Sequence, residues 1–234
     1  MSIAIMQPYV FPYVGYFQLI HASGTFVFYD DVNYINKGWI NRNRILLNNK
    51  DQLFTIPCKE ASQNKLIKDV EVLQDPKSIN KILLTIQPAY KKAPFYNKVF
   101  PLIEEILTLS DGLTISQMAI SCVKNICNYL GMNRQFIISS EKYTNQELKK
   151  ADRLIDICHI EGISDYINAA GGKEIYTKEY FNAGNVNLSF LIPKRCEYIQ
   201  FGATFVPWLS ILDILMFNSK EDIMNKILPS YHID

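Results

Sequence analysis

The stretch SIAIMQPYVFPYVGYFQLIHASGTFVFYDD, residues 2–31, decides the fold. It opens with a short apolar run, Ser2–Met6, which glutamine and proline interrupt, as is typical of a buried strand followed by a break. Residues 13–22 fit a short helix, and Thr25–Tyr29 is dense in β-forming residues before two aspartates end the run. The stretch therefore predicts a strand–helix–strand unit at the start of the chain.

The same alternation continues outward from this stretch. Further strands are predicted at LFTIP (53–57), KDVEVL (68–73, an edge strand), QFIIS (135–139), SDYIN (164–168) and VNLSFLIP (186–193). Helices are predicted at 77–90, 94–109, 115–130, 144–161, 173–184 and over most of 209–228. Thr144 and Glu147 have the spacing of a capping box, and Gly131 and Gly162 suit helix ends.

Strands that alternate with helices predict an α/β fold with a largely parallel sheet flanked by helices, Rossmann-like or nucleotidyltransferase-like. The sequence has no internal repeat and no linker rich in Pro, Gly or Ser. We therefore expect a single α/β domain over residues 1–234, with a helical insertion at about 60–110.

Composition narrows the class of protein. Of the 234 residues, 48% are hydrophobic and 20% are charged, and Lys+Arg (24) nearly balance Asp+Glu (23). A net charge of +1 lacks the basic excess of a nucleic-acid-binding protein. No apolar run reaches the roughly 20 residues of a membrane helix, so we expect no membrane insertion. The first residues lack the features of a signal peptide, which predicts a cytoplasmic protein.

The five cysteines are scattered and form no CxxC pair. Cys122 and Cys158 fall on apolar helix positions, so we interpret them as buried thiols rather than disulfide partners. The three histidines are scattered too, and no metal site is predicted.

Polar or glycine residues follow several of the predicted strands. In an open α/β sheet, ligands bind beyond the carboxyl ends of the strands, so these residues are candidates for a small-molecule pocket. They are Gln7, Pro8, Asp30, Asp31, Ser139, Ser140, Asn168, Gly171 and Gly172.

Asp30 and Asp31 have two interpretations. Adjacent strand residues point to opposite faces, so the two carboxylates need not form a pair. Either one suits a general base for an amine or hydroxyl, and the two together suit a cation. The alternative is a turn that caps the next segment, where Asp is common.

Residues 39–44, WINRNR, form the densest polar cluster. Arg42 offers a planar fork of donors for phosphate or carboxylate, and Asn41 and Asn43 each add a donor and an acceptor. Trp39 and Tyr34 suit stacking on a base or a sugar ring. The alternative is a surface hairpin with solvated arginines.

Two further patterns suggest anion binding. Tyr13 and Tyr16 occupy the start of the first helix, where nucleotidyltransferases of the HxGH type carry histidines; here they suit stacking, hydrogen bonding or an aromatic core. Ser139 and Ser140 precede Lys149, Lys150 and Arg153, which predicts either a phosphate pocket or the solvated face of a helix.

Several stretches together resemble the WbqC-like family of bacterial proteins. They are MQPYVFPYVGYFQLI, FVFYDDVNYINKGWINRNRI, QPAYKKAPFY, ADRLIDICHIEGISDYINAAGGKEIY and YIQFGATFVPWLSILDILMFN, and they cover nearly the whole chain. The motif positions are Gln7, Pro8, Gly15, Tyr16, Asp30, Asp31, Trp39, Asn41, Arg42, Asn43, Tyr90, Gln200, Ser210 and Asp213. One departure is Asn168-Ala169-Ala170, where the family usually has a run rich in serine and glycine.

Members of the family are often found with genes for O-antigen and other surface polysaccharides. The resemblance implies a transferase that attaches a glycine-like amino acid or related acyl group to a nucleotide-linked amino sugar. In that reaction Asp30 or Asp31 would deprotonate the sugar ammonium, and the cofactor would be ATP with magnesium or an activated aminoacyl donor. The alternatives are an ATP-dependent nucleotidyltransferase or adenylate-forming ligase, and a non-catalytic protein that binds a glycan precursor.

Arg42 completes the expected catalytic set with the two aspartates. The expected substrate-binding residues are Gln7, Tyr16, Tyr34, Trp39, Asn41, Asn43 and Ser139.

Overall fold

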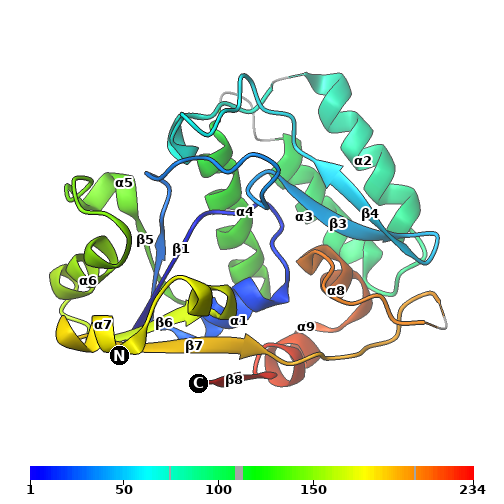
Figure 1. Cartoon of the computed structure of the whole chain (residues 1–234). Coiled ribbons are helices and arrows are strands. Elements are labelled where there is room, and N and C mark those ends of the chain that lie inside the picture. Colours follow the sequence, from blue (N-terminus) through cyan, green and yellow to red (C-terminus); the bar gives the residue numbers. More distant parts are fainter. Residues whose placement is uncertain (74, 109–112, 203) are drawn as a thin grey trace.

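The structure is a computed structural model that describes residues 1–73, 75–108, 113–202 and 204–234. Among these residues, six strands form one sheet in the order β5-β2-β1-β6-β7-β8 (Figure 1). Their bounds are β1 Ser2–Met6, β2 Thr25–Phe28, β5 Gln135–Ile138, β6 Asp165–Ala169, β7 Asn187–Pro193 and β8 Tyr231–Ile233.

All neighbouring strands from β5 to β7 run parallel, and only β8 pairs antiparallel, with β7. Strand order runs outward in one direction from β1 through β2 to β5 and in the other through β6 to β7. The expected α/β fold with a largely parallel sheet is therefore confirmed. The order reverses between β1 and β6, which is where ligands bind in many folds of this kind.

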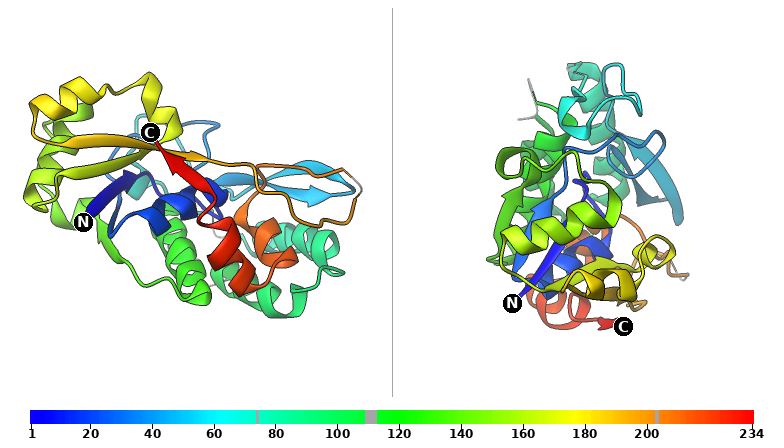
Figure 2. Two further views of the ribbon diagram at one scale, coloured as in Figure 1. Left: turned by 90° about the horizontal axis from the view of Figure 1, so that it is seen from below. Right: turned by 60° about the vertical axis from the view of Figure 1, so that its left-hand side comes forward.

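Helices cover both faces of the sheet (Figures 1 and 2). On one face, α1 (Val14–Ala22) and α4 (Ile115–Leu130) bury their side chains against Ala4, Phe26 and Phe28. On the other face, α6 (Lys150–Ile160) and α7 (Lys178–Ala183) pack against Ile3, Ile5 and Val27. Because successive side chains of a strand point to opposite faces, strands such as β1 and β2 contribute side chains to both cores.

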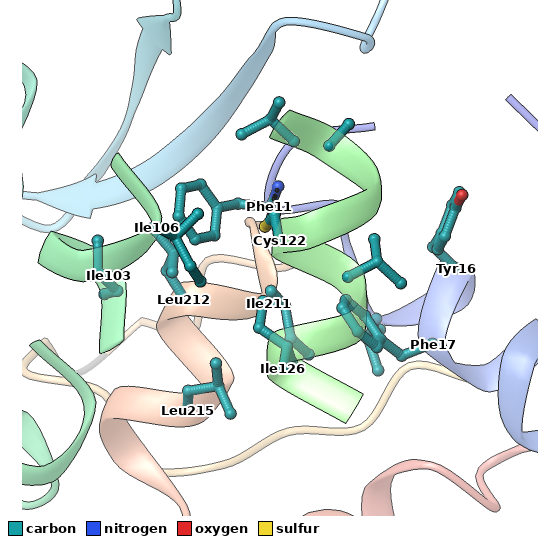
Figure 3. Close-up of a cluster of buried hydrophobic side chains, with 14 of the residues drawn as sticks. Phe11, Tyr16, Phe17, Ile103, Ile106, Cys122, Ile126, Ile211, Leu212 and Leu215 are labelled. Atoms are coloured by element: carbon teal, nitrogen blue, oxygen red, sulfur yellow. Dashed lines mark hydrogen bonds between the residues drawn. The ribbon is translucent and has the colours of Figure 1, made fainter. Parts of the chain in front are cut away.

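The first and larger of these cores extends well beyond the sheet. It includes α2 (Pro76–Tyr90), α3 (Tyr96–Thr108) and α8 (Ile211–Phe217), together with the antiparallel hairpin of β3 (Arg42–Leu47) and β4 (Lys50–Thr55). Figure 3 shows Ile103 and Ile106 of α3 facing Cys122 of α4 and Leu212 of α8. α9 (Lys220–Asp222) and a π-helical turn, η3 (Ile223–Ile227), lead to β8.

The predicted elements agree with most of the structure. Strand–helix–strand over residues 2–28, the helix at 115–130 and strands β5, β6 and β7 lie where the sequence predicts them. Helices α2 and α3 occupy the expected helical insertion at about 60–110, although residues 74, 109 and 110 of that range lie outside the described residues.

Three predictions of local structure were wrong. Residues 68–73 form no strand: they include part of a short 3₁₀ helix, η1 (Ile67–Asp69), and isolated bridges from Glu71 and Val72. The helix expected from the capping box at Thr144 begins only at Lys150. Residues 173–184 are not one helix, because a 3₁₀ turn, η2 (Ala170–Glu174), precedes α7. The tail also ends in a strand, β8, that the sequence did not indicate.

Candidate functional site

Asp30 and Asp31 follow β2 at the carboxyl edge of the sheet and turn to opposite faces. Asp30 faces α4, where Ser116 Oγ lies 3.4 Å from its carboxylate. It also accepts two hydrogen bonds from Ser140, at 2.9 Å from the backbone N–H and 2.7 Å from Oγ. Asp30 as a whole residue is 3% exposed. Neutral donors thus hold Asp30 in a fixed position, and no cation pairs with it among the described residues.

Asp30 lies in the wall of a cavity of about 440 Å³ between η1, α4 and the segment that follows β5. Two ammonium groups, those of Lys68 and Lys124, line the same cavity, as does a second carboxylate, Glu141. The remaining polar lining consists of hydroxyls and amides, from Thr114, Ser116, Gln117, Ser121, Asn125 and Ser140. The cavity therefore combines one buried carboxylate with cations and uncharged hydrogen-bonding groups.

Helix α4 supplies much of this lining because of where it begins. Thr114 caps the helix, and its hydroxyl and the Gln117 side chain form a reciprocal capping box. Ser116 and Lys124 are eight residues apart and so lie on the same side of the helix, with Ile120 between them. The Lys124 side chain has no hydrogen bond or ion pair within the described part of the chain, whereas Lys68 Nζ lies 3.1 Å from Asp69.

Asp31 lies on the other face of the sheet in a buried ion pair with Arg153 of α6. The distance from Arg153 Nη2 to Asp31 Oδ2 is 2.5 Å, and Gln146 Nε2 donates to the same oxygen at 3.0 Å. Burial acts to raise the pKa of Asp31, but the hydrogen bonds from Arg153, Ser139 and Gln146 outweigh it, so the pKa is lowered. Asp31 is therefore held ionised by a structural partner.

This pairing accounts for the cations that the sequence placed near Ser139. Arg153 is buried under Tyr29, with its guanidinium carbon 4.8 Å from the ring centroid, and its Nε donates to Asn145. Ser139 is fully buried beside the same guanidinium, at 3.5 Å. Arg153 is thus turned inward, and Ser139 lies on the Asp31 face while Ser140 lies on the Asp30 face.

The residues of the 39–44 cluster belong to β3 and the loop before it. Asn41 accepts a hydrogen bond from the buried Tyr34 hydroxyl at 2.7 Å and donates to Ile56 O. Burial raises the pKa of Tyr34 to about 12. Asn43 donates to Phe11 O at 2.7 Å. These three side chains hold the fold together locally, and Tyr34 is not at the protein surface.

Solvent reaches three members of the cluster, Trp39, Arg42 and Arg44. Trp39 is 43% exposed, and the guanidinium carbons of Arg42 and Arg44 lie 5.7 and 5.4 Å from its ring centroid. Arg42 also donates to the carbonyls of Gly38 and Lys37. The loop before β3 thus presents a tryptophan beside two arginines of the hairpin, and none of the three lines the Asp30 cavity.

The loop between β1 and α1 contains Gln7 and Phe11. Gln7 is half-buried: its carbonyl accepts from the fully buried Tyr16 hydroxyl at 3.0 Å, and its side chain lies 3.4 Å from Tyr9 Oη. Phe11 has a φ of +46°, which is rare for a bulky residue. Its N–H points to Cys122 Sγ at 3.3 Å (Figure 3). Its carbonyl accepts from Ser210 Oγ at 2.7 Å and from Asn43.

Gly15 explains how this loop joins the helix. A Cβ at Gly15 would lie 2.5 Å from the ring of Tyr13, so the tyrosine occupies the space that only a glycine leaves free. Tyr13 also contacts Trp208, with ring centroids 6.5 Å apart. Tyr13 and Tyr16 therefore serve packing at the start of α1.

A third buried carboxylate, Asp213 of α8, has only neutral partners. Tyr198 Oη and Gln200 Nε2 each donate to Oδ2 at 2.6 Å, and Tyr90 Oη donates to Oδ1 at 2.9 Å. Tyr90 Oη in turn accepts from Leu46 N–H at 2.9 Å. Burial raises the pKa of Asp213, and the three hydrogen bonds only partly offset it. This cluster ties α2, β3, α8 and the loop after β7 together.

Sequence reasoning missed several groups of the Asp30 cavity, including Ser116, Lys68 and Lys124. The sequence did contain a signal for Ser116. It is a polar residue at the start of a helix whose other residues follow an apolar, core-forming pattern. A signal was also present for Asp213, a lone acid within the apolar run LSILDILMF. In the described ranges, no three His, Cys, Asp or Glu side chains are grouped so as to hold a metal ion.

The fold and this edge of the sheet define an α/β protein with a polar cavity beside the carboxyl end of β2. The model of the WbqC-like protein family matches residues 7–225, and the chain belongs to that family. It is 26% identical over 217 residues to "Uncharacterized protein Rv1507c" of Mycobacterium tuberculosis (strain ATCC 25618 / H37Rv), with 92% of each chain covered. No solved structure matches the chain significantly. Within the described ranges, no helix has the length and apolar character to cross a membrane.

Proposed function

We propose that this protein is a transferase that attaches an amino acid, or a related acyl group, to a nucleotide-linked amino sugar in surface-polysaccharide synthesis. The observation that carries the proposal is the cavity beside Asp30. A buried carboxylate held by neutral donors faces a space that also receives two lysines. An amino sugar on a nucleotide carries the complementary groups, an ammonium and phosphates.

In the proposed reaction Asp30 is the general base. It accepts a proton from the sugar ammonium, and the free amine attacks the carbonyl carbon of an activated aminoacyl donor. A new C–N bond forms, the bond to the leaving group breaks with its electron pair, and the second amine proton is released as the intermediate collapses. Catalysis by a positioned base contributes roughly 10²–10⁴-fold to the rate.

Lys68 and Lys124 supply charge for the phosphates, and the hydroxyls of the wall suit the hydroxyls of the sugar. The cavity volume of about 440 Å³ lies within the 300–1,000 Å³ that is usual for ligand pockets. Asp31 has a different task in this proposal, because its carboxylate is paired with Arg153 on the opposite face.

The test is mass spectrometry of amino-sugar nucleotides incubated with the protein, ATP, magnesium, and glycine or alanine. A mass gain of one amino-acid residue on one member of the panel supports the proposal. Asp30→Asn should lower that turnover by about 10²-fold or more while the fold is kept. Asp165→Asn, the same change at an exposed aspartate at the start of β6 that does not line the cavity, is the matched control.

No mass gain on any member, with the sugar of the neighbouring gene cluster included, would overturn the transferase. Tight sugar-nucleotide binding without turnover, unaffected by Asp30→Asn, would instead favour a non-catalytic binding protein. Mass spectrometry and calorimetry on the same set of amino-sugar nucleotides distinguish these two outcomes, because the first measures turnover and the second measures binding.

A second candidate function is ATP-dependent nucleotidyl transfer or adenylate formation. The specific observation in its favour is the reversal of strand order between β1 and β6, with α1 starting after β1. That position binds nucleotides in many α/β folds. Magnesium-dependent release of pyrophosphate from ATP would support this function over simple acyl transfer.

A further inference from the structure

The β3–β4 hairpin is closed by a two-residue turn, Asn48-Asn49. Both asparagines have positive φ, +52° and +59°, which is the type I′ turn that matches the twist of paired strands. The register pairs Leu47 with Lys50 and Arg44 with Leu53. In Figure 2 (left view) the hairpin lies at one end of the molecule beside the loop that follows β7.

The outer edge of β3 is occupied. In an antiparallel ladder, residue pairs alternate between those that exchange hydrogen bonds and those whose backbone groups point outward. Ile56 N–H donates to Asn41 O at 2.7 Å, so these two residues form a hydrogen-bonded pair. The backbone groups of the next pair, Arg42 and Thr55, therefore point outward, and the pattern alternates from there. The outward carbonyl of Arg44 accepts from Ser210 N–H at 2.8 Å, and the outward N–H of Leu46 donates to Tyr90 Oη at 2.9 Å.

Among the described residues, no other strand pairs with the outer edge of β4. The same alternation turns the backbone groups of Asp51, Leu53 and Thr55 outward. Within the described residues, the one hydrogen bond to these groups comes from the exposed side chain of Gln52, which donates to Leu53 O at 3.1 Å. A six-residue strand thus leaves three N–H groups facing solvent.

The edge has only part of the usual protection against pairing. Natural edge strands are shielded by proline, bulges, a covering segment or charged side chains, and β4 carries two charges, Lys50 and Asp51, at its turn end. β4 contains no proline, and its ladder to β3 runs without a bulge from Lys50 to Thr55. Leu53 is 43% exposed, and Trp39, also exposed, lies over Arg44, the residue opposite Leu53. An exposed leucine therefore lies on the open backbone edge, next to Arg44 and Trp39.

We propose that β4 pairs antiparallel with β4 of a second copy of this chain, with Leu53 opposite Leu53 across the two-fold axis. In this register the outward residues meet outward residues, so three residue pairs each exchange two backbone hydrogen bonds. The two hairpins then form one four-stranded sheet, and a two-fold axis closes the assembly as a dimer.

Charge complementarity favours a second copy in this register. In this register, Asp51 lies opposite Thr55 of the partner copy. Within that copy, Thr55 of β4 pairs with Arg42 of β3. Asp51 already lies 3.2 Å from Arg44 of its own chain. Each Asp51 carboxylate would therefore lie between two arginines, one from each copy. Moving the two-fold axis from Leu53 to Asp51, which is a slip of four residues between the strands, would instead bring the two Asp51 carboxylates together, which is unfavourable.

The test is the molar mass of the full-length protein by light scattering and sedimentation over a range of concentrations. We expect about twice the 27.0 kDa of one chain, and one chain mass for Leu53→Pro. Proline at position 53 removes an outward N–H, so it leaves the hydrogen bonds within the hairpin intact. Leu53→Val keeps the N–H and an apolar side chain and should remain dimeric.

Residue-resolved hydrogen exchange identifies the edge directly. The amides of Asp51, Leu53 and Thr55 should become protected as protein concentration rises, whereas those of Gln52 and Phe54 should be protected throughout. A single-chain mass at all concentrations would overturn the proposal, even if the edge binds some other extended peptide. A dimer that survives Leu53→Pro with its native circular dichroism would overturn it equally.

Discussion

Asp31 and Asp213 are both buried carboxylates, yet their surroundings shift their pKa values in opposite directions. Asp31 has a guanidinium partner, and its pKa is lowered. Asp213 has three uncharged donors, and its pKa is raised. Hydrogen bonds alone thus do not offset the loss of hydration of a buried charge, whereas hydrogen bonds combined with a cation do.

The largest effect should come from breaking the Asp31 pair. Arg153→Met keeps the aliphatic stem but leaves a buried carboxylate without its cation, which costs about 3–5 kcal/mol. The free energy of unfolding, measured by urea denaturation, reports this loss. Arg195→Met removes a surface arginine that pairs with Glu197 and should cost no more than about 1 kcal/mol. Equal losses for the two variants would contradict the structural role of Arg153.

A smaller effect is expected at Asp213. Tyr90→Phe removes the donor to Asp213 Oδ1 and the acceptor of Leu46 N–H, and an unsatisfied buried group costs about 1–3 kcal/mol. The same urea measurement applies. The matched control is Tyr96→Phe, because Tyr96 stacks on Phe100 and its hydroxyl donates to no carboxylate among the described residues. No loss for Tyr90→Phe would mean that water or a rotated side chain replaces the hydroxyl.

The pH dependence of the two sites should have opposite sign. Asp31 contributes stability above its ordinary pKa of about 3.9, and this is lost as the pH falls through its lowered pKa. Ionisation of Asp213 costs stability as the pH rises from about 3.9 through its raised pKa. Each unit of pKa shift corresponds to about 1.4 kcal/mol.

Asn substitutions measure this directly. The stability of Asp31→Asn should fall furthest below that of the wild-type protein near pH 7, and the difference should become smaller at acidic pH. The stability of Asp213→Asn relative to the wild type should increase as the pH rises, because asparagine keeps a hydrogen-bond acceptor and removes the buried charge. Thermal unfolding from pH 3 to 7 gives both curves, and parallel curves would contradict the opposite pKa directions.

The smallest effect on stability is expected at Lys124, which borders the Asp30 cavity without a partner among the described residues. Lys124→Ala should change the free energy of unfolding by no more than about 0.5 kcal/mol. If the cavity binds a nucleotide sugar, the same change should weaken binding in calorimetry. Lys226→Ala, at an exposed pair with Asp222, is the control that should leave binding unchanged.

Strand ends and helix periods were sufficient to predict most of the sheet. The alternation of side chains along β2 also predicted that Asp30 and Asp31 need not share a site. The composition of the cavity could not be predicted in this way, because Ser116 meets Asp30 across 86 residues of sequence. The spacing of apolar residues predicts that a segment is helical. It does not indicate which distant carboxylate will contact the residues at the start of that helix.

The wrong start of α6 has a related cause. Thr144 and Glu147 have the local spacing of a capping box, but their neighbours are bound elsewhere. Asn145 donates to Asp156 and accepts from Arg153, and Gln146 donates to Asp31. These tertiary hydrogen bonds keep residues 143–149 out of the helix, and Lys150 then enters it with a φ of +51°.

The backbone of Phe11 also bears on the order in which the chain folds. Its strained conformation is held by Cys122 and, across 199 residues of sequence, by Ser210. Contacts between such distant segments form late, because a long loop must close first. The first loop of the chain therefore acquires its final shape only after nearly the whole chain has left the ribosome. Any ligand that needs this loop finds no binding site on a partly synthesised chain.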